Sequence, residues 1–193
     1  MAENKVQFNL KNVHYALLKA TNEAGKVSYA WETPVPVPGA VTLTLDPAGD
    51  VTPFYADGVI YYSAVSNQGY SGSLEIARFP DQMLQDIWGF TKGETSNVLT
   101  ENASINPKDF ALLYQIDGDS GNQCYAMYNC TATRPGVGSA TTTASKEPHT
   151  QTTNLTAAAL LDGRVMARTT ATTPDDVKAA WFSAVYEDTT AAG

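Results

Sequence analysis

Apolar and polar residues alternate along much of the chain, in runs of about five to ten residues that are rich in Thr, Tyr and Val. A period of two is typical of β-strands with one buried and one solvated face. Val41–Leu45 shows it most plainly, because three apolar residues alternate with two threonines. The pattern therefore predicts a mainly β domain.

The same pattern predicts further strands, separated by turns that contain Gly, Asn and Asp. They are Val27–Trp31, Val59–Ser66, Tyr70–Arg78, Val98–Glu101, Asp109–Asp117, Gln123–Thr133, Thr150–Leu161 and Arg164–Thr170. We expect Val59–Ser66 and Tyr70–Arg78 to pair as one long hairpin around Asn67–Gly69. We expect Arg164–Thr170 to pair back on its predecessor across the Asp162–Gly163 turn.

Two short amphipathic helices flank these strands in the prediction. The first begins at Pro80 and Asp81 and ends at Gly89, with an apolar stripe between them. The second is predicted over Pro174–Val185, which has a proline in its first turn and acidic residues at its positive end.

Two segments lack periodicity. Three alternate prolines in Glu32–Gly39 restrict the backbone and remove hydrogen-bond donors, which predicts an extended, unpaired connector over residues 32–39. Arg134–Pro148 is rich in Pro, Gly, Ser and Thr and is longer than a usual connection, which predicts a functional or disordered loop over residues 134–148. With no repeat and no second core, we expect one domain over residues 1–193.

The two cysteines, Cys124 and Cys130, lie on one predicted strand. An extended backbone would hold them about 20 Å apart on the same face, too far for a disulfide. We expect both to be small, buried apolar residues.

Composition narrows the function. The 193 residues contain 12 Lys and Arg against 20 Asp and Glu, a net charge of -8, so a surface that wraps nucleic acid is not expected. With 43% hydrophobic residues the chain can form a core. No apolar stretch approaches the roughly 18 residues of a membrane span, and the polar start is unlike a signal peptide, so we expect a protein that is made in the cytosol and not exported.

Residues for catalysis or metal binding are few. His14 and His149 are the only histidines, and neither has the spacing of a zinc site. The glycine- and serine-containing turns do not form a nucleophile elbow, and Asp117–Asn122 lacks the carboxylate that would close a calcium loop. We predict no enzyme activity and no catalytic, cofactor-binding or metal-ligating residue.

Six segments, in order over roughly residues 4 to 135, resemble the major tail protein, or tail tube protein, of long-tailed bacteriophages with non-contractile tails. They are Asn4–Ala16, Pro34–Gly39, Phe54–Gly58, Gly69–Ala77, Phe110–Tyr114, and Tyr128–Cys130 followed by Arg134–Pro135.

This resemblance implies a β-sandwich or barrel with a flanking helix, assembled as a hexameric ring in which the inward strands form one continuous barrel. Rings of the family stack into the tail tube through which DNA is ejected. The implied partners are further copies of the chain, a tape measure protein, a tail terminator, and baseplate or distal tail proteins. DNA would pass without specific binding, no membrane is involved, and the implied location is the virion, after synthesis in the host bacterial cytoplasm. The chain ends at Gly193, so we expect no appended immunoglobulin-like domain.

Two sets of site residues follow from this hypothesis. A DNA conduit needs a wall without cations that would hold phosphate, and six chains of charge -8 give about -48 per ring. The lumen-facing candidates are the polar positions of two strands, Ser71, Ser73, Glu75, Thr150, Thr152, Asn154 and Thr156; an ordinary solvated face is the alternative. The candidates for contacts between subunits or rings lie in the two aperiodic segments: Pro34, Val35, Pro36, Val37, Pro38, Arg134, Pro135, Thr141, Thr142 and Thr143.

Three alternative functions remain open. A ring-forming tube protein of a bacterial secretion system has a similar shape. A small hydrolase would need a nucleophile and an acid to converge on His14 or His149. A monomeric carbohydrate-binding β-sandwich would use exposed aromatic residues such as Tyr61, Tyr62 and Tyr70.

Overall fold

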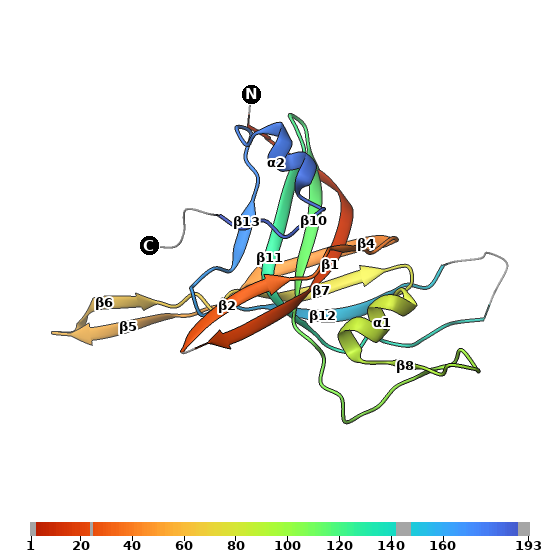
Figure 1. Ribbon diagram of the computed structural model, residues 1–193. Helices are drawn as coiled ribbons and strands as arrows, with labels where there is room; N and C mark the ends of the chain where they lie inside the picture. The colour runs from red at the N-terminus through yellow and green to blue at the C-terminus, as the bar shows by residue number, and fades with distance from the viewer. Residues whose placement is uncertain (1–2, 24, 142–147, 189–193) are drawn as a thin grey trace.

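A curved antiparallel sheet organises the chain in the computed structural model, which describes residues 3–23, 25–141 and 148–188 (Figure 1). Its strands are β1 (Gln7–Glu23), β2 (Lys26–Trp31), β3 (Val35–Pro36), β4 (Ala40–Pro47), β7 (Tyr70–Ile76), β10 (Phe110–Gly118), β11 (Gln123–Ala132), β12 (Gln151–Ala157) and β13 (Met166–Arg168). The main order is β2-β1-β10-β11-β12-β7-β4, with β3 beside β1 and β13 beside β11. The prediction of a mainly β domain is confirmed.

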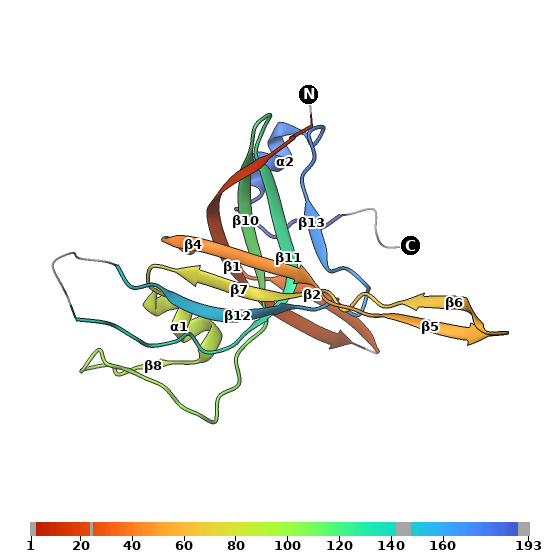
Figure 2. The same cartoon turned by 180° about the vertical axis from the view of Figure 1, so that it is seen from behind.

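Two small hairpins lie outside this sheet. One consists of β5 (Val51–Ala56) and β6 (Val59–Val65), and it projects far from the body of the molecule (Figures 1 and 2). The other consists of β8 (Thr91–Lys92) and β9 (Leu99–Thr100). Each is a separate two-stranded sheet.

The sheet bends because β1 changes partners along its length. Its first part pairs with β10 and its last six residues pair with β2. Asn9 and Asn12 have φ angles of 37° and 50°, and register shifts in the β1–β10 ladder accompany them. These bulges bend the strand and interrupt the apolar and polar alternation, so the pattern in this region did not predict a strand.

The central strand β10 is buried on both faces. Phe110, Leu112 and Tyr114 pack into one core cluster, and Ala111 and Leu113 pack into a second. A strand inside two clusters needs apolar side chains at almost every position, as this one has.

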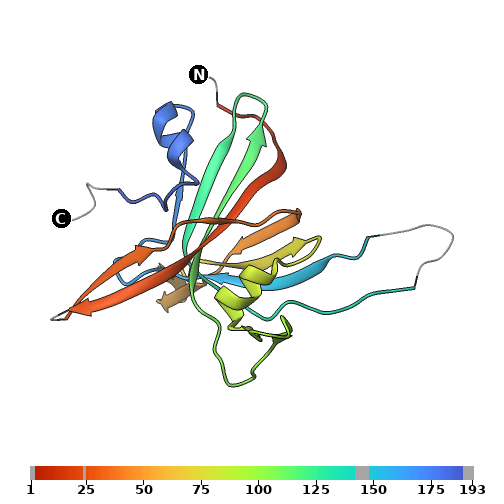
Figure 3. The ribbon, with the colours of Figure 1, turned by 45° about the vertical axis from the view of Figure 1, so that its right-hand side comes forward.

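The first cluster is covered by helix α1 (Asp81–Trp88), which lies against the curved sheet (Figure 3). The helix begins after Pro80 and ends at Gly89 in the left-handed conformation, as predicted. Met83, Ile87 and Trp88 form its buried face, and the Trp88 indole donates to the carbonyl of Thr133 at 2.9 Å.

Residues near the carboxyl-terminal end of the chain cover the second cluster. Helix α2 (Asp175–Ala180) is shorter than the predicted Pro174–Val185, and the irregular residues after it supply Trp181 and Val185 to the cluster. The Trp181 indole donates to the carbonyl of Tyr125 on β11 at 3.2 Å. Trp181 and Val185 therefore pack in the cluster although the helix ends before them.

Two of the predicted strand pairings are wrong. β6 does not pair with β7: it pairs with β5 across the Asp57–Gly58 turn, and β7 lies between β4 and β12. β13 does not pair back on β12; both pair with β11, β13 at Tyr125–Met127 and β12 at Cys130–Ala132. Both errors paired a strand with the wrong neighbour in sequence: β6 pairs with the strand before it instead of the strand after it, and β13 pairs with the more distant β11.

The connector over residues 32–39 is extended as predicted, but it is not unpaired. Val35 and Pro36 pair with β1, and the Val37 amide donates to the Val13 carbonyl at 2.7 Å. Val37 is buried in the first cluster. Burial of the apolar Val37 side chain stabilises this arrangement, although the prolines on either side of it cannot donate hydrogen bonds to β1.

Both cysteines are buried and free, as predicted, but they do not share a face. Cys124 packs in the second cluster and Cys130 in the first. A register shift in the β10–β11 ladder between Phe110 and Leu112 moves the later residues of β11 to the opposite face.

Candidate functional site

The polar positions predicted to face a lumen come together on one surface. β7 and β12 are adjacent in the sheet, with Ser71 opposite Thr156, Ser73 opposite Asn154 and Glu75 opposite Thr152. Thr150, just before β12, donates its hydroxyl to the Glu75 carboxylate at 2.5 Å. The intervening residues, such as Leu74 and Leu155, point into the core instead.

The surface continues onto the end strand β4. Thr42 lies opposite Glu75, Thr44 opposite Ser73 and Asp46 opposite Ser71. We call the outward positions of β4, β7 and β12 the polar face; its members are Thr42, Thr44, Asp46, Ser71, Ser73, Glu75, Thr150, Thr152, Asn154 and Thr156. It carries carboxylates and hydroxyls but no Lys or Arg. Whether this face lines a lumen stays a prediction.

The β5–β6 hairpin forms a second surface, of the opposite character. Eight of the fourteen large hydrophobic side chains that are exposed among the described residues belong to it. They are Val51, Phe54, Tyr55, Val59, Ile60, Tyr61, Tyr62 and Val65. Tyr61 is 74% exposed and Val65 is 77% exposed, so almost nothing within the chain covers them.

Apolar residues occupy both faces of this hairpin. Residues opposite one another share a face, so Tyr55 and Ile60 lie on one side, and Phe54 and Tyr62 lie on the other. A strand pair that is apolar on both sides is typical of elements covered on both sides. The alternation pattern predicted a hairpin of β6 with β7; the signal for the correct hairpin was the Asp57–Gly58 turn between two apolar runs.

The first segment predicted to contact other subunits, residues 34–38, is partly buried within the chain itself. Pro34 and Val37 are buried, whereas Pro36 and Pro38 are exposed and Val35 is half-buried. Intersubunit roles for this segment stay predictions.

The second of these segments, after β11, contacts the rest of the chain at several points in its described part, and the Gly136 amide donates to the Thr152 carbonyl at 3.1 Å. The Arg134 side chain forms an ion pair with Glu101 at 2.8 Å, and Pro135 and Thr141 follow in the loop. Thr142 and Thr143 lie outside the described residues. An intersubunit role for this loop also stays a prediction.

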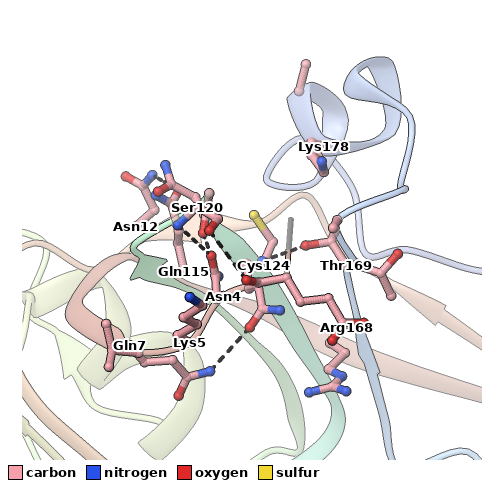
Figure 4. A pocket seen from close by; sticks show the side chains of 18 of the residues that line it. Asn4, Lys5, Gln7, Asn12, Gln115, Ser120, Cys124, Arg168, Thr169 and Lys178 are labelled. Atoms are coloured by element: carbon pink, nitrogen blue, oxygen red, sulfur yellow. Dashed lines mark hydrogen bonds between the residues drawn. The ribbon is translucent and has the colours of Figure 1, made fainter. Parts of the chain in front are cut away.

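A third feature is a cleft of about 930 Å³ at the end of the molecule that carries the amino terminus and α2 (Figure 4). The amino-terminal segment, the β10–β11 turn, the end of β13 and α2 form its walls. Lys5, Arg168 and Lys178 line it from three of these segments, and Glu3 is the carboxylate among the lining residues. The cleft is therefore cationic, although the chain as a whole is acidic.

The histidines do not assemble a hydrolytic site in the described part of the chain. The His14 ring hydrogen-bonds to the Asn12 carbonyl at 2.9 Å and stacks on Phe182, and His149 Nε2 accepts from the Ala140 amide at 3.1 Å. Within the described residues neither ring has a hydrogen bond to a serine, a cysteine or a carboxylate. No group of three or more His, Cys, Asp or Glu side chains there is arranged to hold a metal ion.

The exposure of the tyrosines bears on the carbohydrate alternative. Tyr61 and Tyr62 are exposed on β6, whereas Tyr70 is half-buried against the first core cluster. None of the described helices is long and apolar enough to span a membrane.

The sequence matches no protein-family profile and no curated protein. One solved structure, described as the anti-feeding prophage cap that terminates the tube, is similar over 88% of this chain and 97% of its own, at 15% identity and a TM-score of 0.43.

Proposed function

We propose that the chain is a structural tail protein that self-assembles into stacked hexameric rings, forming a tail tube that conducts DNA into the host. It acts as a building block and not as an enzyme. Its proposed location is the virion, where it would meet the tape measure protein, the terminator and the distal tail proteins of the phage.

The observation that carries this proposal is the exposed β5–β6 hairpin. An isolated two-stranded hairpin is marginally stable in water, and contiguous apolar surface on a soluble protein marks an interaction site. Apolar side chains on both of its faces need partners on both sides. In a self-assembling tube, these partners are further copies of the chain.

The polar face supports the conduit part of the proposal. Phosphate would bind to Lys or Arg on a tube wall, and this face has neither. Its Glu75 and Asp46 would repel passing phosphate, and its hydroxyl groups are neutral. The face spans three adjacent strands and ends at β4. Because β4 is an end strand of the sheet, a strand of a neighbouring copy can pair with it and continue the face.

The first experiment is negative-stain electron microscopy of the purified protein over a range of concentrations, with light scattering for mass. Rings or hollow tubes of uniform width are the expected result. A protein that is monomeric at every concentration would contradict self-assembly, and glycan binding by that monomer would favour the carbohydrate-binding alternative. Export of the protein by living cells would favour the secretion tube.

A hairpin replacement tests which element drives assembly. Residues 51–65 are exchanged for a short Asn-Gly turn, which the chain can accept because Ala48 and Gly69 are already hydrogen-bonded at the hairpin base (2.8 Å). We expect assembly to be lost, with the unfolding temperature of the monomer almost unchanged, because the hairpin contributes nothing to either core cluster.

The matched control for the hairpin replacement is Val98→Ala, which removes an exposed apolar side chain elsewhere. It should assemble like the unaltered protein. A hairpin-replaced chain that still forms rings or tubes would show that the hairpin is not the assembly element.

A further inference from the structure

The tip of the β5–β6 hairpin carries one charge. Asp57 is the sole charged residue in positions 51–65, and it sits at the turn with a φ of 54°, followed by Gly58 at 78°. This tight turn places a carboxylate at the far end of an apolar arm. Six extended residues project the tip about 20 Å from the base of the hairpin.

The cationic cleft has the complementary character. Lys5 and Arg168 are exposed, and neither is in any of the ion pairs formed within the described residues, so their charges are available to a partner. Lys178 adds a third cation, at 4.0 Å from Asp175. The remaining walls mix amide side chains with apolar groups such as Val6 and Phe182, which suits a partner that is apolar with an acidic end.

The tip cannot reach the cleft of its own chain. The hairpin projects from one side of the molecule, whereas the cleft lies at the end formed by the amino terminus and α2, and opposite views agree on this separation (Figures 1 and 2). A volume of about 930 Å³ is in the range of clefts that hold a ligand or a short peptide turn.

We propose that the cleft is the docking site for the hairpin tip of a second copy of this chain, with Asp57 held by Lys5, Arg168 and Lys178. The inference rests on the proposed self-assembly and names the contact that drives it. The tip and the cleft are different patches, so each copy can offer its tip to one neighbour and its cleft to another, in a head-to-tail contact. Such a contact repeats from copy to copy and produces rings or filaments instead of stopping at a dimer.

Charge reversal tests the pairing. In the tip variant, Asp57→Lys, a cation meets a cationic cleft. In the cleft variant, Lys5→Glu with Arg168→Glu, the acidic tip meets a cleft in which carboxylates outnumber cations three to one. We expect each variant alone to need about tenfold more protein to assemble, because a favourable charge contact has become a repulsive one.

Mixing the two variants is the decisive measurement. The lysine tip of one then faces the acidic cleft of the other, and the acidic tip faces the intact cleft, so assembly in an equimolar mixture should return toward that of the unaltered protein. Glu94→Lys, an exposed reversal outside both patches, is the control and should assemble normally. Circular dichroism of each variant checks that it is folded.

The outcomes separate the two proposals. If the unaltered protein assembles and both variants assemble equally well, the docking contact is overturned while self-assembly stands. Folded variants that fail alone and also fail when mixed overturn it as well, since complementary charges then do not restore the contact. If the unaltered protein stays monomeric, both proposals are overturned.

Discussion

Arg164 shows how one side chain can hold the carboxyl-terminal segment against the sheet. Its guanidinium lies over the rings of Trp31 and Tyr128, 5.9 Å and 5.2 Å from their centroids. It forms an ion pair with Asp162 at 2.7 Å and approaches Glu187 at 3.9 Å. Contacts with two aromatic rings and two carboxylates restrict the side chain to one position.

The Asp162 contact makes the stability depend on pH. The hydrogen bond from Arg164 is the main cause that lowers the pKa of the Asp162 carboxyl in the folded chain. Since the unfolded value is about 3.9, the stabilisation is present above that pH and is lost as the pH falls through the lower folded value.

Asp162→Asn should therefore lower the free energy of unfolding near neutral pH by less than about 1 kcal/mol, the usual size for a solvent-screened pair. Thermal unfolding of both proteins, from pH 7 down to about pH 2, should show this difference shrinking in acid. Asp175→Asn, at an exposed carboxylate, is the control and should have little effect at either end. A difference for Asp162→Asn that is constant over the whole range would contradict the linkage.

At the scale of elements, β7 depends on a very close approach to β4. Gly72 pairs with Leu45 of β4 and with Leu155 of β12. A Cβ at this position would overlap the carbonyl oxygen of Thr44. That atom belongs to the backbone of the neighbouring strand, so the clash cannot be relieved by turning a side chain.

Gly72→Ala should consequently lower the free energy of unfolding by about 1–3 kcal/mol, as overpacking usually does. Chemical denaturation measures the change. Gly121→Ala is the matched control, because a Cβ there meets nothing within 4 Å, and it should leave stability almost unchanged. Equal stability of the two variants would show that the β4–β7 ladder can separate at little cost.

For the molecule as a whole, the question is which way the polar face points. If it lines the lumen, Glu75→Lys places six cations on the wall of each hexameric ring, and these would bind phosphate. Assembled tubes of this variant should then bind duplex DNA at least about tenfold more tightly at roughly 50 mM salt than at roughly 200 mM salt. DNA ejection should also slow.

The control for the lumen prediction is Glu94→Lys, which adds the same charge at the β8–β9 hairpin. It should affect DNA retention much less. Tubes of Glu75→Lys that retain and release DNA like the unaltered tubes would place the polar face on the outside.

Local pattern was enough to determine helix α1 and most strands, including the outward positions of β7 and β12, but it missed β1 and β5. The alternation over residues 151–157 and 70–76 predicted which side chains of β7 and β12 are solvated, and the proline and glycine at the ends of α1 predicted its bounds. Each of these depends on interactions between residues close in sequence, which is why the sequence by itself determined them.

Only the tertiary structure decided which strands are neighbours. Period-two alternation indicates that one face of a strand is buried, but it does not indicate which strand lies beside it. The pattern therefore predicted the wrong partners for β6 and β13. The cationic cleft could not be predicted for the same reason: Lys5 lies far in sequence from Arg168 and Lys178, and the three converge only when β10, β11 and β13 share one sheet. Pairing across such distances depends on how apolar faces fit together over the whole chain, which local pattern does not contain.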